Sequence, residues 1–337
     1  MRCCWHYNDL SLVFLLLQGM LLDAHFRMTI DQQHDQTSLL ACLLPCIPYL
    51  SVEQWQQLLV SGLIKLQGEV VLSDCPVSIG QVIDYMVPDY EEDEVDTNWS
   101  LLWQNEHIAA VHKPANLPVS RTTRNVYNTL IQILRRESPW PDAHLLHRLD
   151  LETSGIILIA HDNEQAKYYQ PKLSELMLCK KYRAIVHGKP AWQTLEHSSY
   201  LNTKKDSAIR CQMHSVEQGQ GKFSETHFTV LACANGFSLI ECELLTGRKH
   251  QIRAHLSELG HPIVGDKIYA NNGEFYLKRL DDGLTQADHE ALLVEHHLLH
   301  AYEVQLNNMW QVGDECLVIQ DDHYSDIWLR FSEQVGL

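Results

Sequence analysis

Basic residues are scarce in this sequence. Its 337 residues include 26 lysines and arginines against 43 aspartates and glutamates, which gives a formal net charge of −17. Proteins that bind nucleic acids usually carry a basic surface, so the whole-chain charge argues against that class. The distribution reverses the argument: residues 101–270 contain 20 basic and 16 acidic side chains, and the rest of the chain contains 6 and 27. We therefore expect an anionic ligand to bind the middle of the chain.

Paired cysteines and metal-binding motifs are also lacking. The ten cysteines include no C-x-x-C pair, and no pair of Cys or His residues stands near Cys42 and Cys46 to complete a site. The twenty histidines include no H-E-x-x-H motif. The sequence therefore predicts no metal site, and it indicates reduced thiols in a cytoplasmic protein.

No apolar run is long enough to cross a bilayer. The longest, Leu10–Leu17, is too short. It makes a poor signal peptide, because Arg2 is the only early cation and the residues around Ala24 make a poor cleavage site. We expect residues 1–38 to be a poorly structured or misassigned extension, with Met28 as an alternative start, and we expect no membrane association.

Residues 39–90 are expected to form a small α/β module. Ser51 and Gln54 have the spacing of a capping box at the start of an amphipathic helix. A short hairpin over residues 64–72 follows this helix. The acidic residues 91–96 are expected to form a linker.

Residues 99–330 are expected to form a larger second domain that contains many strands and few helices. Asn235–Gly236 between two apolar segments is the strongest hairpin signal in the chain. "SGIILIA" (residues 154–160) has the composition of a buried strand. Strands paired by hairpins predict the α+β class, with a mostly antiparallel mixed sheet.

The first candidate motif is "HRLDLETSG", residues 147–155. Arg148 and Asp150 flank one leucine, and the residues that follow lead directly into the predicted buried strand. A carboxylate on a loop beside a rigid strand is well placed for chemistry. An ordinary surface loop with a capping aspartate is the alternative.

The second candidate motif is "LLTGRKHQIRAH", residues 244–255, in which a strand ends and a helix begins. Arg248 and Lys249 lie at the predicted helix start, where backbone N–H groups also attract anions. His250 and Arg253 share one helix face with Ser257, and the apolar residues form the buried face. A phosphate site is favoured over a solvated basic helix end.

Together these motifs resemble those of the RluA-type pseudouridine synthases. "HRLDLETSGIILIA" and "TGRKHQIRAHLSELGHPIVGDKIY" are similar to the family's two signatures, and "KPANLPVS" and "LLHAYEVQL" are similar to its opening and closing segments, in the same order. The resemblance covers residues 99–306. It implies a catalytic domain with a basic cleft and no metal or organic cofactor. The module at 39–90 resembles, in degenerate form, the small S4-like RNA-binding domain of many such enzymes.

The resemblance also implies roles for individual residues. Asp150 corresponds to the catalytic carboxylate, Tyr182 to the active-site tyrosine that stacks on the base and whose phenol could help to remove the C5 proton, and Arg253 to the cation paired with the aspartate. Arg148 corresponds to the arginine that displaces the target base. The expected substrate-binding residues are Arg148, His147, Thr153, Arg248, His250, Lys180 and Lys181, and further phosphate contacts are expected from Arg121, Arg124, Lys204 and Lys205.

Other functions remain open from the residues alone. A catalytically silent RNA-binding or ribosome-assembly factor would have lost Asp150, Tyr182 or Arg253, and all three are present. A glycosidase would need a second carboxylate, and only Glu152 stands nearby. The resemblance favours a monomeric enzyme that isomerises a uridine of rRNA or tRNA.

The uneven charge predicts a strong salt dependence. If residues 101–270 neutralise phosphates, counterions are released on binding, and the logarithm of RNA affinity should fall linearly and steeply with the logarithm of salt concentration despite the net charge of −17. Binding curves measured between about 50 and 200 mM salt test this. A flat plot would exclude a basic RNA-binding surface.

Overall fold

The computed structural model describes residues 22–45, 50–90, 92–122, 125–281, 283–307 and 316–337. The chain forms two compact units. The N-terminal unit contains the residues up to Glu94 and also Arg121–Asn128, and the C-terminal unit contains Val95–Ser120 and Thr129–Leu337. The apolar run Leu10–Leu17 lies outside the described residues. Within them, no helix reaches the length and apolarity that a bilayer crossing requires.

The N-terminal unit is a four-stranded sheet in the order β1-β4-β2-β3, with helices packed on it. Its elements are β1 (Leu22–Thr29), the 3-10 helix η1 (Gln32–His34), α2 (Leu39–Leu43), α3 (Val52–Val60), β2 (Ile64–Leu66), β3 (Glu69–Val70) and β4 (Val82–Tyr90). The capping box of Ser51 and Gln54 is present at the start of α3, and the predicted hairpin forms between β2 and β3.

The predicted boundary of the extension at residue 38 is wrong. Strand β1 begins before Met28 and pairs antiparallel with β4 along its length. Ala24 and Ile30 are completely or almost completely buried in the apolar core of this unit. The alternation of apolar and polar residues over 22–29 is typical of a strand with one buried face, and the extension predicted from the neighbouring segments overlooks it.

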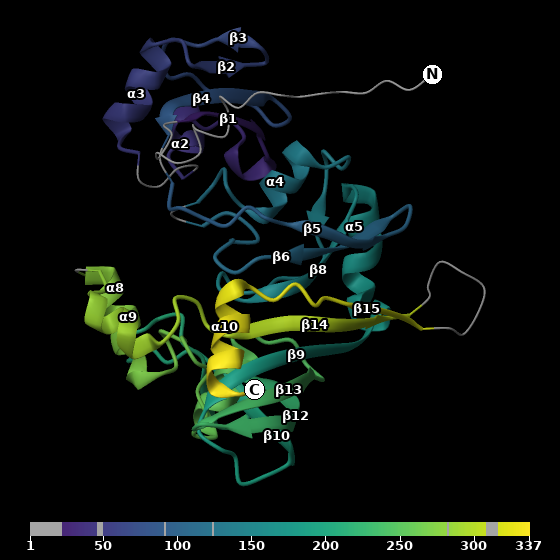
Figure 1. Cartoon of the computed structure of the whole chain (residues 1–337). Coiled ribbons are helices and arrows are strands. Elements are labelled where there is room, and N and C mark those ends of the chain that lie inside the picture. Colours follow the sequence, from purple (N-terminus) through teal and green to yellow (C-terminus); the bar gives the residue numbers. More distant parts are fainter. Residues whose placement is uncertain (1–21, 46–49, 91, 123–124, 282, 308–315) are drawn as a thin grey trace, which may run out of the picture. The chain divides into compact units, whose positions relative to one another are not determined.

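The C-terminal unit is built on a sheet that curves through most of the unit (Figure 1). Its strands are β5 (Ser100–Gln104), β6 (Ile108–Lys113), β7 (His144–Leu145), β8 (Ser154–Ala160), β9 (Met177–His187), β10 (Thr194–Asn202), β11 (His214–Val216), β12 (Lys222–Ala234), β13 (Phe237–Leu244), β14 (Leu299–Leu306) and β15 (Leu317–Gln320). Its helices are α4 (Leu130–Glu137), α5 (Asn163–Tyr169), η2 (Gln170–Lys172), α6 (Leu173–Leu176), α7 (Gln251–Glu258), η3 (Asn271–Gly273), α8 (Glu274–Asp281), α9 (Gln286–Leu292) and α10 (Asp326–Val335).

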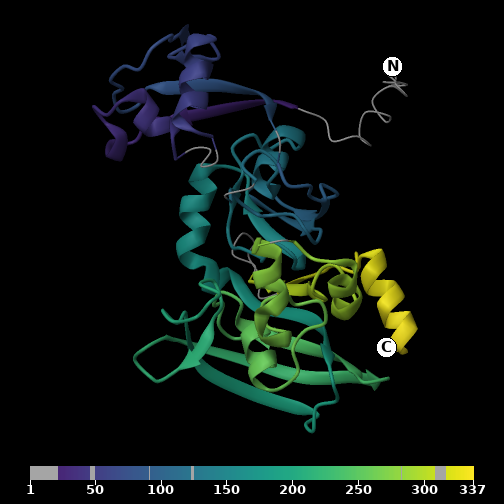
Figure 2. The same cartoon turned by 90° about the vertical axis from the view of Figure 1, so that its left-hand side faces the viewer.

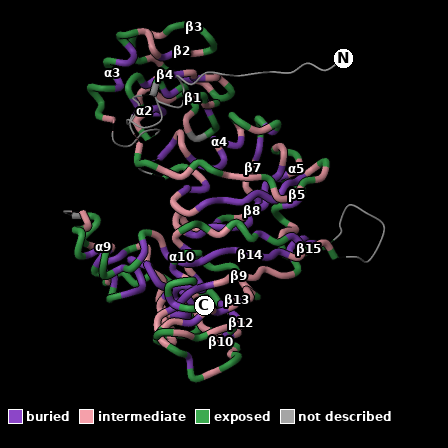
Figure 3. The backbone as a smooth tube through the Cα atoms, in the orientation of Figure 1, coloured by how far each residue is buried: buried purple, intermediate pink, exposed green. Residues whose placement is uncertain are grey.

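The strand order is β11-β10-β12-β13-β9-β14-β8-β6-β5, with β15 on β14 and β7 on β8. Neighbouring strands are antiparallel except for β14 and β8, which run parallel. Central strands β8 and β14 are buried over nearly their whole length (Figure 3). In Figure 2, α10 (yellow) lies along one side of the sheet, where its Phe331 ring contacts Phe237. The predicted α+β class with a mostly antiparallel mixed sheet is confirmed.

Local signals placed several of these elements correctly. The Asn235–Gly236 turn joins β12 to β13, and both residues have positive φ. Asp162 caps α5 by accepting a hydrogen bond from the backbone N–H of Gln165. The predicted single buried face of α7 is incomplete, because Gln251, Arg253 and His255 are buried as well.

Gly155 is the glycine on which the parallel pairing of β8 with β14 depends. Its φ is +110°, and a Cβ built there would lie 2.3 Å from the carbonyl oxygen of Ala301 and 2.6 Å from its nitrogen. The backbone of Ala301 cannot move away from an added Cβ as the end of a flexible side chain could. Glycine is therefore required at this position.

We predict that Gly155→Ala destabilises the protein by more than about 3 kcal/mol, because strained backbone and overpacking add. Gly236→Ala is the matched control, because its φ is +85° and no atom lies within 4 Å of its added Cβ. That control should cost only about 1 kcal/mol. Chemical denaturation of both variants measures the difference, and equal losses would show that the close approach to Ala301 is unimportant.

Candidate active site

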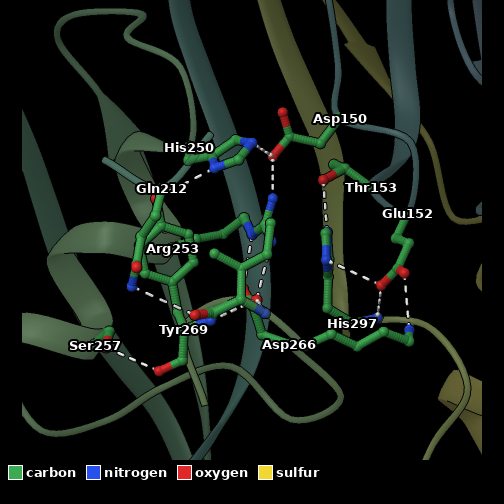
Figure 4. Close-up of polar contacts among 12 residues, drawn as sticks. Asp150, Glu152, Thr153, Gln212, His250, Arg253, Ser257, Asp266, Tyr269 and His297 are labelled. Carbon is green, nitrogen blue, oxygen red and sulfur yellow. Dashed lines mark hydrogen bonds and ion pairs between the residues drawn. The ribbon is translucent and has the colours of Figure 1, made fainter. Parts of the chain in front are cut away.

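Asp150 lies on the loop between β7 and β8, beside the start of α7 (Figure 4). Its Oδ2 atom accepts a hydrogen bond from Nη1 of Arg253 at 2.7 Å, and Nε2 of His250 lies 3.8 Å away. The side chain of Asp150 remains 26% exposed, and that of Arg253 is 6% exposed. The carboxylate is therefore held by a buried cation and still accessible to a ligand.

Arg253 is itself fixed from behind by Asp266. Nε of Arg253 donates to one oxygen of Asp266 at 2.7 Å, and Nη2 donates to the other at 2.9 Å. Asp266 is fully buried and also accepts the backbone N–H groups of Ile268 and Tyr269. This two-pronged contact orients the guanidinium so that its remaining Nη1 faces Asp150.

The electrostatics keep Asp150 ionised. Burial alone would raise the pKa of Asp150, but the charge of Arg253, the proximity of His250 and the hydrogen bond from Arg253 outweigh it and lower that pKa to about 2. Burial lowers the pKa of His250 to about 4, so its imidazole is neutral at physiological pH. Nδ1 of His250 lies 3.2 Å from the hydroxyl of Tyr269, which fixes the ring beside Asp150.

Tyr182 lies on β9 and is 9% exposed. Burial, and then the charge of Asp150, raise the pKa of its phenol well above the ordinary value, so the phenol stays protonated. Its hydroxyl forms no hydrogen bond with any residue in the part of the chain that the structure describes. A neutral ring beside Asp150 suits stacking on a base or donating a hydrogen bond, whereas a phenolate base for the C5 proton is disfavoured.

A second polar network supports the Asp150 loop (Figure 4). Oγ1 of Thr153 lies 2.8 Å from Nε2 of His297, and Glu152 accepts the backbone N–H of the same histidine. Nζ of Lys267 donates to Glu152 at 2.8 Å. Burial raises the pKa of Glu152, but its contacts with His297 and Lys267 hold it well below its usual range.

These contacts correct two predictions. Thr153 is buried and bonded to His297, so its side chain is not directed at a ligand. Glu152 is paired with Lys267 and therefore cannot serve as the second carboxylate of a glycosidase, which must approach the substrate freely.

Several predicted substrate-binding residues lie at or near Asp150. Arg148 is exposed and forms no side-chain hydrogen bond or ion pair with the described residues. Lys180 shares a strand face with Tyr182, because alternate residues of a strand point the same way, and its Nζ would lie 3.6 Å from a Cβ at Gly247. Arg248 is exposed and donates through Nε to the carbonyl of Phe223.

Other predicted residues lie elsewhere. Nε2 of His147 accepts the backbone N–H of Leu158, and burial lowers the pKa of His147 to about 4, so it is a neutral structural residue. Lys181 points to the opposite sheet face from Tyr182 and pairs with Glu241 at 3.4 Å. Arg121 belongs to the N-terminal unit, where it donates to the carbonyl of Pro45. Lys204 and Lys205 are exposed, and Arg124 lies outside the described residues.

Motif reading missed three residues that hold the site together. Asp266 and Lys267 stand in the quoted segment "VGDKIY", but their partners are over a dozen and over a hundred residues away. Lys113 is fully buried and donates to the carbonyls of Pro114, Leu117 and Leu151, the last within the Asp150 loop. Lys113 is the first residue of the quoted segment "KPANLPVS", but the motif does not reveal its contact with Leu151, 38 residues away.

Comparisons with known proteins show the family. A family model described as "RNA pseudouridylate synthase" matches residues 107–258, which include Asp150, Tyr182 and Arg253. Ribosomal large subunit pseudouridine synthase D of Xylella fastidiosa is 30% identical over 239 residues, which are 69% of this chain and 71% of that protein. This chain belongs to the RluA-type RNA pseudouridine synthases. It is thus an isomerase that acts on RNA.

A further relative and a solved structure are similar to this pseudouridine synthase. The synthase D of Zymomonas mobilis is 28% identical and is matched over 76% of this chain and 81% of its own length. The structure of human RNA pseudouridylate synthase domain containing 4 shares the fold, with a TM-score of 0.54 at 23% identity, over 70% of this chain and 93% of that one.

We predict unequal effects of two substitutions at Arg253. Arg253→Leu leaves Asp150 and Asp266 without their cation, which should cost about 3–5 kcal/mol of stability. Burial would then raise the pKa of Asp150, so activity should fall as the pH drops through a higher value than in the wild type. Arg253→Lys keeps one positive charge but loses the two-pronged contact of the guanidinium. Its stability and the pH dependence of its activity should therefore change less than those of Arg253→Leu.

The sign of the wild-type pH dependence follows from the same pKa. Because the pKa of Asp150 is lowered to about 2 in the folded protein, its ion pair stabilises the fold fully above pH 4 and is lost as the pH falls toward 2. Denaturation curves measured from pH 2 to 8 test the wild type and both substitutions, and tritium release from C5-labelled uridine in RNA, measured from pH 4 to 8, tests their activity. Equal losses in both would mean that the two-pronged geometry matters more than the charge.

Proposed function

We propose that this enzyme isomerises a uridine of large-subunit ribosomal RNA, with Asp150 as the catalytic carboxylate. The observation that carries the role of Asp150 is its geometry: an ionised, partly exposed carboxylate bonded at 2.7 Å to a buried arginine. The RNA class is supported by the relatives in Xylella fastidiosa and Zymomonas mobilis, both named as ribosomal large subunit pseudouridine synthase D.

The reaction needs little more than a well-placed carboxylate. The bond from N1 of uracil to ribose C1′ breaks, the base turns, and C5 bonds to C1′, while C5 loses a proton and N1 gains one. The carboxylate of Asp150 can add to an electron-deficient C1′, as in retaining glycosidases, or can take a proton from the ribose. Both roles require the ionised form, which Arg253 maintains.

Base extrusion would use groups around Asp150. The target nucleotide must leave its stack at a cost of a few kcal/mol. The exposed guanidinium of Arg148, two residues before Asp150, can fill the vacated space by stacking. The neutral phenol ring of Tyr182 can then pack against the extruded uracil.

Phosphates would be held by exposed cations just before α7. Arg248 and Lys249 are exposed just before α7, and Lys180 lies nearby, next to Gly247. Burial lowers the pKa of Lys180, and the charge of Arg248 lowers it further. A phosphate placed between these two cations would relieve their repulsion, which supports an RNA backbone contact here.

The silent-factor alternative is distinguished by Asp150→Asn. We predict that this nearly isosteric change lowers isomerisation at least about 1,000-fold, because a neutral amide is a poor nucleophile and base. RNA affinity should remain within a few fold of the wild type, because it depends on the surrounding cations. Tritium release and a filter-binding curve measure the two effects on the purified variant.

In a deletion strain, the wild-type gene should restore a pseudouridine in large-subunit rRNA, and the Asp150→Asn gene should not. If the missing modification lies in tRNA instead, the proposed substrate class is wrong but the catalytic role stands. Tritium release by the variant at the wild-type rate would overturn the role of Asp150.

A further inference from the structure

Three potential metal ligands meet on a part of the C-terminal unit that the chemistry does not use. Nδ1 of His112 lies 2.6 Å from Oδ2 of Asp321, and Nδ1 of His323 lies 2.8 Å from its Oδ1. One ligand atom from each of the three residues lies within 4.8 Å of the others. Residues more than 200 positions apart thus converge on a single carboxylate.

The carboxylate of Asp321 is fully buried, and its only ion-pairing partners within the described chain are histidines. Oδ1 of Asp321 also accepts the backbone N–H of His323 at 3.0 Å. A buried carboxylate is costly without a full positive charge close by. A metal ion bound between these ligands would supply that charge.

A further histidine holds Asp321 in place from behind. Nε2 of His300 lies 2.9 Å from the backbone carbonyl oxygen of Asp321, and Nδ1 of the same ring lies 2.8 Å from Oγ of Ser154. His300 is fully buried. Metal-binding residues are usually held by such second contacts, which orient them before the ion arrives.

We propose that His112, Asp321 and His323 bind a divalent transition-metal ion, with Zn²⁺ as the best fit. Two imidazole nitrogens and one carboxylate oxygen are ligands that Zn²⁺ accepts, and a fourth position would be left for water. The side chain of His323 is 61% exposed, so an ion can enter from solvent on its side.

Binding requires only a small expansion of the cluster. Ligand atoms about 2.0–2.1 Å from a tetrahedral Zn²⁺ are about 3.4 Å apart. The two contacts of Asp321 are shorter, at 2.6 and 2.8 Å, because protons now bridge them. Each ring can carry its proton on Nε2 instead, and the exposed ring of His323 has room to move outward.

The proposed role is structural. His112 and Lys113 are consecutive on β6 and therefore point to opposite faces of the sheet. Lys113 supports the Asp150 loop through the carbonyl of Leu151, whereas His112 faces the segment that follows β15. The ion would fasten that segment to β6 and would take no part in isomerisation.

The test compares His323→Ala with His289→Ala, a change at another exposed histidine outside the cluster. Full-length protein is stripped with chelator and dialysed against Zn²⁺, and bound metal is measured by mass spectrometry. We expect the wild type and His289→Ala to bind one more tight equivalent than His323→Ala, whose affinity at this site should fall at least about 100-fold. The added metal should also raise the melting temperature of the first two proteins only.

His323→Cys distinguishes a metal-binding role of residue 323 from a packing role. A thiolate is also a zinc ligand, so this variant should restore the Zn²⁺ equivalent that His323→Ala loses. The same protein loaded with Co²⁺ should then show the visible absorption of a tetrahedral site. Equal Zn²⁺ content and affinity in the wild type and His323→Ala would overturn the proposal, because the metal would then sit on other histidines or cysteines. Absence of tight binding to the wild type would overturn it equally.

Discussion

The active site depends on one buried cation shared between two carboxylates. Arg253 contacts Asp266 through two nitrogens and Asp150 through the third. The single positive charge of Arg253 does not balance the two negative charges of Asp150 and Asp266. Backbone N–H groups of Ile268 and Tyr269 complete the environment of Asp266. The hydrogen-bonding capacity of Asp266 is thus filled without the Nη1 atom of Arg253. That atom remains free to donate to Asp150, which is partly exposed to solvent.

This arrangement joins two loops that are far apart in sequence. The loop that carries Asp150 also carries Glu152, and the loop that carries Asp266 also carries Lys267, so the two loops are connected by Arg253 and by the Glu152–Lys267 pair. The loop that carries Asp150 leads into a rigid element, because β8 is fully buried and its parallel pairing with β14 at Gly155 fixes where it begins. A catalytic group needs such support to hold its geometry within a fraction of an ångström.

The sequence predicted local features and motif residues well, and partner residues poorly. The capping box at Ser51, the turn at Asn235 and the buried strand β8 depend on neighbours in sequence, and each was found. The pairing of Asp150 with Arg253, expected from family resemblance, is also present. Strand β1 was not predicted although its residues alternate between apolar and polar, because the apolar run before it suggested an extension outside the fold.

The side-chain predictions failed for a related reason. Thr153, His147 and Lys181 have suitable residue types within suitable motifs, yet their side chains point to His297, Leu158 and Glu241. For Lys181, the two-residue period of a strand already indicates that its side chain points to the opposite face from that of Tyr182. For the other two, the partner becomes visible only when distant segments pack together, as it does for Asp266 and Asp321.

The distribution of protonation states explains how an acidic protein can act on RNA. Burial keeps His250 neutral and Tyr182 protonated, so neither side chain adds a charge beside Asp150. The positive charges that remain available, on Arg148, Arg248 and Lys249, are exposed. Phosphates would therefore meet cations first, while the extruded base would reach a carboxylate whose charge is already partly offset by Arg253. Because a screened surface charge acts over only about 10 Å, the acidic groups elsewhere on the chain need not oppose binding at this site.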